Sequence, residues 1–154
     1  MLVLFFKLLA VLLMGIGFGI LYRIPRSLLV PSGLVGSGAW LIYYLSLLGG
    51  LDSLFANFLA SLALGVAAET MARLFQKPAS LFTLIGFIPL VPGRDAYTAM
   101  LLLVKGNYIE GMAVAIQAML IAGAIAFGIL LSSAVYRSVI NLGRKGGWIH
   151  VGGG

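Results

Sequence analysis

The chain has 154 residues, of which 62% are hydrophobic and only 9% are charged. A water-soluble domain of this length cannot hide so large an apolar share in one core, so the composition excludes a soluble domain and indicates an integral membrane protein. The ten Lys and Arg residues separate apolar runs and do not form the basic stripe of a nucleic-acid-binding protein. The absence of cysteine excludes disulfides and thiolate chemistry.

Five apolar runs are each long enough to cross a hydrocarbon layer, which takes roughly 20 residues. In chain order they are 2–22, 30–48, 53–75, 79–104 and 111–136. The sequence therefore predicts an all-α bundle of five transmembrane helices. The second run is the weakest, because Pro25 and Pro31 shorten its start, and a re-entrant segment there would leave four spans. Residues 1–137 are expected to form one transmembrane domain, followed by a short cytoplasmic, basic and glycine-rich tail over 138–154.

Basic residues mark one side of the predicted membrane. They follow the first, third and fifth runs: Arg23 and Arg26, Arg73 and Lys77, and Arg137, Arg144 and Lys145. Because Lys and Arg accumulate in cytoplasmic loops, five spans place the amino terminus outside and the carboxyl terminus in the cytoplasm.

Small residues recur inside the runs. They are Gly15, Gly17 and Gly19 in the first, Gly33, Gly36 and Ser37 in the second, and Ala118, Ala122 and Ala126 in the fifth. Helices in lipid associate by close backbone approach, so these positions predict tightly packed helices.

The fourth run contains two prolines, Pro89 and Pro92, which each lack an N–H and obstruct the preceding helical turn. The run is therefore expected to break into half-helices over 79–88 and 94–104. Broken backbone at membrane depth must be buried in protein or line an aqueous cavity. The first half-helix, of about ten residues, reaches roughly 15 Å, the middle of a hydrocarbon layer. The second would present free N–H groups and the positive end of its dipole there, where an anion binds well.

Ionisable residues at membrane depth are costly and are therefore candidates for function. Arg94 is predicted to hold a substrate carboxylate, and Asp95 to cap the half-helix, bind a substrate amine or carry a proton. The structural alternative is that the two neutralise each other or lie near an interface. Glu69 is a second candidate for ion or proton coupling, although its spacing to Arg73 equally suits an interfacial salt bridge. Asn57, Thr98 and Gln117 are candidates for lining the path or for bonding between helices.

Enzyme chemistry is not expected. His150 is the only histidine and lies in the polar tail, and Asp95 has no second aspartate in a comparable run. Neither a serine–histidine pair, a histidine metal cluster nor an aspartyl pair can therefore form within the membrane. No metal and no cofactor is predicted.

The segment 87–100, Phe-Ile-Pro-Leu-Val-Pro-Gly-Arg-Asp-Ala-Tyr-Thr-Ala-Met, resembles the threonine/serine exporter (ThrE) family, in particular its smaller, YjjB-like carboxyl-terminal module. The similarity includes 22–26 with the glycine-rich 33–38, and 60–73 with Pro78, so it covers most of residues 15–130. The residues that match the family pattern are Pro89, Pro92, Gly93, Ala96 and Tyr97, whereas Arg94 and Asp95 occupy positions that vary in the family.

The resemblance implies an exporter in the bacterial inner (cytoplasmic) membrane, driven by an ion gradient, for threonine and serine or for a dicarboxylate such as succinate. It also implies a partner, the larger YjjP-like amino-terminal module, and a homo- or hetero-oligomer in the lipid bilayer. Together, the break and the resemblance predict a substrate site at Pro89, Pro92, Gly93, Arg94, Asp95, Tyr97 and Thr98. The alternatives are a non-catalytic assembly subunit and a small-solute channel.

Overall fold

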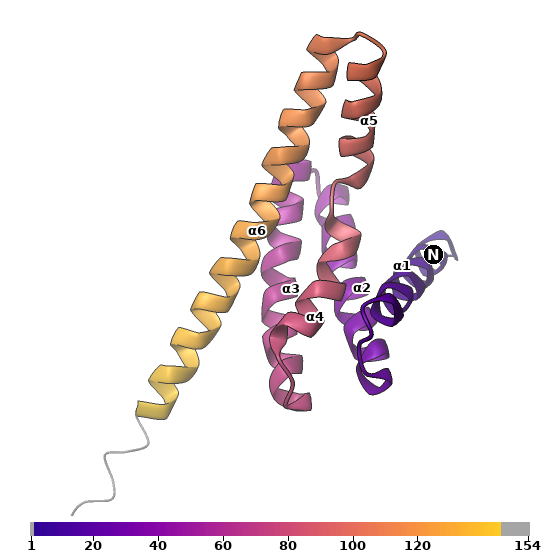
Figure 1. Cartoon of the computed structure of the whole chain (residues 1–154). Coiled ribbons are helices and arrows are strands. Elements are labelled where there is room, and N and C mark those ends of the chain that lie inside the picture. The colour runs from indigo at the N-terminus through magenta and orange to yellow at the C-terminus, as the bar shows by residue number, and fades with distance from the viewer. Residues whose placement is uncertain (1, 146–154) are drawn as a thin grey trace, which may run out of the picture.

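The computed structural model describes residues 2–145, and within that range the regular structure is helical (Figure 1). The elements are α1 (Leu2–Leu21), α2 (Arg26–Leu48), α3 (Ser53–Phe75), α4 (Ala79–Phe87), the 3-10 helix η1 (Ile88–Leu90), α5 (Gly93–Val104) and α6 (Tyr108–Lys145). Four helices are long and apolar enough to cross a membrane, and the bent pair 79–90 and 93–104 makes a fifth if it counts as one span. The predicted all-α membrane bundle is confirmed.

Helices α2, α3 and α4 contact one another at the centre of the bundle, with α1 packed on α2 and α6 on α3 (Figure 1). Helix α5 leaves this group and packs mainly along the first part of α6. The two most apolar spans, α1 and α6, are also the least buried, whereas α2 and α3 are less apolar and more buried. Lipid-facing and protein-facing helices are thus distinguished by composition as well as by position.

Helix α2 is longer than the sequence suggested. It begins at Arg26, after Pro25, and Pro31 lies inside it. A proline at this position removes the hydrogen bond of its own N–H and its ring crowds the carbonyl four residues earlier, but the helix continues through it. The second segment is therefore a continuous span of 23 residues, and a re-entrant segment at this place is wrong.

Helix α6 also extends further than expected. The apolar run was expected to end near Tyr136, but the helix continues to Lys145, so the first part of the predicted tail is helical. No proline interrupts 137–145, and a helix does not end merely because its side chains become polar. The rest of the predicted tail, 146–154, lies outside the described residues.

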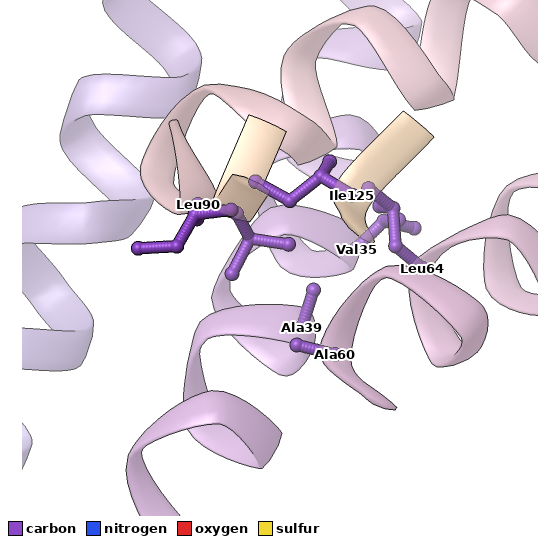
Figure 2. Close-up of a cluster of buried hydrophobic side chains, with 7 residues drawn as sticks. Val35, Ala39, Ala60, Leu64, Leu90 and Ile125 are labelled. Atoms are coloured by element: carbon purple, nitrogen blue, oxygen red, sulfur yellow. The ribbon is translucent and has the colours of Figure 1, made fainter. Parts of the chain in front are cut away.

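A cluster of buried apolar side chains joins α2, α3, η1 and α6 (Figure 2). Its members are Val35, Ala39, Ala60, Leu64, Leu90, Ile121 and Ile125. Close backbone contacts accompany it: a Cβ added to Gly36 would lie 3.3 Å from the Cα of Gly86, so α2 and α4 cross at glycine on both sides. Packing of this kind stabilises helices in lipid, where burial of apolar surface gives little driving force.

Helices α3 and α6 meet along a reciprocal seam of glycine and serine. Ser61 of α3 lies against Gly128 of α6, and Ser132 of α6 lies against Gly65 of α3. Each serine donates to its own helix, Ser61 Oγ to the Phe58 carbonyl and Ser132 Oγ to the Ile129 carbonyl, both at 2.8 Å. Both hydroxyls are therefore satisfied without a partner across the seam, and the contact between the helices is one of shape.

Candidate functional site

The break in the fourth run lies where the prolines predict it. Helix α4 ends at Phe87, η1 follows with Pro89 in its first turn, and α5 begins directly after Pro92, bent by 51° from the preceding pair α4–η1. Pro92 precedes the helix, where its missing N–H is not needed, and its backbone has φ −74° and ψ 54°. The expected half-helices are confirmed, each to within one residue.

The depth of the break follows from Leu90, which is the last residue of η1 and is buried in the cluster of Figure 2. Ala60 of the same cluster lies roughly 11 Å along α3 from the end that begins at Ser53, since a helix rises about 1.5 Å per residue. All 23 residues of α3 span roughly 34 Å. Leu90 therefore lies about a third of the way along α3, and α5, which begins three residues later, continues past the end of α3 where that helix starts (Figure 1).

The amino-terminal end of α5 has no side-chain cap. The Gly93 N–H donates to the Val91 carbonyl at 2.8 Å, and the Ala96 N–H to the Pro92 carbonyl at 3.0 Å. The N–H groups of Arg94 and Asp95, between them, belong to the first turn and have no partner in the helix. Asp95 is the third residue of α5 and does not cap it, so that predicted role is wrong. The end keeps donors that an anion can use.

The side chains at this end point in different directions around α5. Arg94 and Tyr97 are exposed, whereas Asp95 and Thr98 are half-buried. Within residues 2–145 Arg94 and Asp95 form no ion pair with each other, so mutual neutralisation does not explain them. Thr98 Oγ1 donates to the Arg94 carbonyl at 2.9 Å and is engaged within the helix.

A groove of about 380 Å³ lies beside the break. It is lined by Phe87, Val91 and Pro92 on one side and by Ala122, Ile125, Ala126 and Ile129 of α6 on the other. These side chains are apolar, so the groove can receive a hydrocarbon group but cannot neutralise a charge. Donors for a carboxylate would come from the adjacent end of α5 and from Arg94.

The other three predicted polar residues lie on α3 and α6. Glu69 is buried in α3, about 13 Å along the helix from Ala60. Asn57 is also buried and its Nδ2 donates to the Ser53 carbonyl at 2.9 Å, which is a bond within its own helix. Gln117 is exposed on α6. Glu69 therefore lies more than two turns of α3 from Ala60, whereas Asn57 lies within one turn of it.

Near Glu69, aromatic and basic side chains join α3 to α6. The Arg73 guanidinium lies over the Tyr136 ring, 5.2 Å from its centroid, and Thr70 Oγ1 is 3.4 Å from the Tyr136 hydroxyl. These contacts link the two helices at the end of α3 where Arg73 lies. In the described residues, no group of three His, Asp or Glu side chains comes together that could hold a metal ion.

Three buried serines were missed by sequence reasoning. Ser61 and Ser132 form the seam between α3 and α6, and Ser32 Oγ in α2 is buried with no hydrogen-bond partner. The seam carries a signal in the sequence, a small residue followed by another four positions later, at 61 and 65 and again at 128 and 132. Ser32 carries the same signal, since Gly36 follows it four positions later.

Comparison with known families identifies the family of this chain. The family model described as Threonine/Serine exporter, ThrE, matches residues 7–135. The chain belongs to the threonine/serine exporter family. The match includes the whole of α2 to α5, so the break lies inside the part that defines the family. No solved structure matches the chain.

Membership in the ThrE family confirms the resemblance carried by Pro89, Pro92 and Tyr97. It makes the chain a multi-pass membrane component of a transporter family. The fold and the family thus agree.

Proposed function

We propose that this chain is a subunit of a gradient-driven exporter of small carboxylates and that the carboxylate binds at the break between η1 and α5. One observation supports this most: α5 begins directly after the break, without a side-chain cap, next to the exposed cation of Arg94. Discontinuous helices hold substrate carboxylates in this way in several secondary transporters.

The groups around the start of α5 suit the binding of an amino acid. The first-turn N–H groups of α5 and the guanidinium of Arg94 can all donate to one carboxylate. Asp95, half-buried on the adjacent side of the helix, would accept from an ammonium group. The apolar groove beside Pro92 leaves room for the methyl group of threonine. A second carboxylate, as in succinate, would have Asp95 as a like-charged neighbour, so threonine and serine are the favoured substrates and succinate the alternative.

The proposal includes a partner and an orientation. The partner is the YjjP-like module, and the chain lies in the bacterial inner membrane with its amino terminus outside and its carboxyl terminus in the cytoplasm. Arg23, Arg73 and Lys77 support this orientation, since basic loops remain cytoplasmic.

Uptake of labelled threonine, serine and succinate into inside-out membrane vesicles tests the function. With the chain and its YjjP-like partner together, we expect saturable uptake that needs an ion gradient, and threonine uptake at least several-fold above succinate uptake. Vesicles with either protein alone are the controls. Substrate binding by the partner alone would favour an assembly subunit, and unsaturable flux without a gradient would favour a channel.

Glu69 is proposed to carry the coupling ion or proton. We expect Glu69→Gln to abolish accumulation against a gradient while downhill exchange continues, because the amide keeps the shape of the side chain but cannot release a proton. Glu110→Gln, the same change at an exposed carboxylate in the first turn of α6, is the matched control. Unchanged accumulation in the Glu69 variant would assign this residue to a structural contact.

A further inference from the structure

The groove beside the break is larger than a methyl group needs. Its volume is about 380 Å³, and pockets that hold whole small molecules begin at about 300 Å³. Among its lining residues, Ile125 of α6 is buried in the cluster of Figure 2, whereas Ala122 and Ala126 of the same helix are exposed. The groove therefore has a packed floor and an open rim, and it can receive a side chain of several carbon atoms.

The chemistry of the groove favours hydrocarbon over hydroxyl. Every side chain that lines it is a hydrocarbon. The carbonyl of Val91, one of the lining residues, already accepts from the Gly93 N–H at 2.8 Å. A substrate hydroxyl placed there would give up its hydrogen bonds to water without finding a side-chain partner, which is unfavourable. An alkyl group of the same shape gains free energy from the same transfer.

The groove adjoins the start of α5, where the carboxylate is proposed to bind. Val91 and Pro92 line the groove, and α5 begins at the next residue, Gly93. The first-turn N–H groups of Arg94 and Asp95 follow directly. One molecule can therefore place its carboxylate at the helix end and its side chain in the groove. Carboxylate and ammonium groups are common to all amino acids, so only the groove distinguishes one amino acid from another.

We propose that the substrate class of this site extends to amino acids with branched apolar side chains, namely valine, leucine and isoleucine, and that these bind more tightly than threonine and serine. The position of the carboxylate rests on the proposed function, whereas the preference for an apolar side chain rests on the groove. A lipid tail offers the same hydrocarbon chemistry. Variants that fill the groove separate these two occupants.

Equilibrium binding of labelled valine and threonine tests the preference. The samples are membranes that contain the full chain with its YjjP-like partner, and membranes with the partner alone are the blank. Valine and threonine differ only by a methyl group in place of a hydroxyl. We expect the Kd of valine to be lower by at least about tenfold, and that of leucine to be lower by about a further fourfold for its additional methylene. Threonine binding as tight as valine binding would overturn the proposal.

Filling the groove tests where the side chain lies. Ala126→Leu, or Ala122→Leu as a second variant, adds bulk at an exposed lining position and so does not overpack the core. We expect each to weaken leucine binding by at least about tenfold and to leave serine binding almost unchanged, because serine needs little room. Ala113→Leu, the same change at an exposed alanine of α6 outside the groove, is the control and should change neither. Undiminished leucine binding in both groove variants would contradict the proposal and leave the groove to a lipid tail.

The binding measurement separates this inference from the proposed function, because it needs neither a gradient nor transport. Tight valine binding without gradient-driven uptake would reject only the exporter. Threonine uptake together with weaker valine binding would reject only the apolar preference. Membranes that bind neither amino acid would reject both.

Discussion

Arg94→Ala is expected to lower kcat/KM for threonine export by about 100-fold, with normal amounts of folded protein in the membrane. Loss of charge-assisted hydrogen bonds to a carboxylate is worth about 3 kcal/mol, and about 1.4 kcal/mol corresponds to each tenfold change. Arg94 is exposed and makes no ion pair among the described residues, so its removal leaves no cavity and no buried charge. Initial uptake rates in inside-out vesicles at several threonine concentrations measure the change.

Two further variants test whether the loss of transport is specific to the guanidinium of Arg94. Arg94→Lys keeps the charge but loses the planar, bidentate geometry, and we expect an intermediate loss. Lys105→Ala removes an exposed cation just after the far end of α5 and should leave kcat/KM unchanged. If Arg94→Ala transports threonine with unaltered kinetics, the carboxylate role assigned to Arg94 is wrong.

Gly128→Ala is expected to destabilise the protein, whereas Gly123→Ala on the same helix is expected to be neutral or slightly stabilising. A Cβ at Gly128 would collide with the Ser61 side chain and lie 3.0 Å from the Phe58 carbonyl oxygen, while one at Gly123 meets nothing within 4 Å. Overpacking costs about 1–3 kcal/mol. Glycine to alanine in an open helix position gains about 0.5–1 kcal/mol. Thermal unfolding in detergent, followed by loss of the monodisperse peak, measures both.

A second substitution in the glycine and serine seam tests whether steric contact between α3 and α6 causes the loss of stability. Gly65→Ala should destabilise in the same way, because its Cβ would lie 2.9 Å from the Cβ of Ser132. Adding Ser132→Gly removes that contact, so the double variant is expected to recover most of the lost melting temperature. Equal melting temperatures for Gly123→Ala and Gly128→Ala would show that α3 and α6 do not meet along this seam.

The sequence allowed the helices and the break to be predicted because both depend on local chemistry. Apolar runs of spanning length give α1 to α3 and α6, and the loss of N–H groups at Pro89 and Pro92 separates α4 from α5. The wrong prediction of a re-entrant segment near Pro31 also arises from local chemistry. A proline near the start of a helix can either precede the helix or lie within its first turns. Which of these occurs depends on the packing of α2, and a single sequence does not reveal it.

The contacts between helices could not be predicted in this way. Ala122 and Ala126 were expected to pack against a helix but line the open groove instead, while Gly128 and Ser132 form the seam with α3. Several small-residue patterns compete in α6, and only the partner helix selects one. The exposure of Arg94 was likewise beyond the sequence, because it depends on α5 leaving the bundle.

The difference in polarity between the spans has a consequence for biosynthesis. Helix α1 is strongly apolar and scarcely buried, so it can pass from the translocon into lipid without help. Helices α2 and α3 are less apolar and rely on contacts with each other and with α4. Their stable insertion must therefore await the synthesis of later segments, and a nascent chain that ends after α2 should be retained at the translocon or degraded.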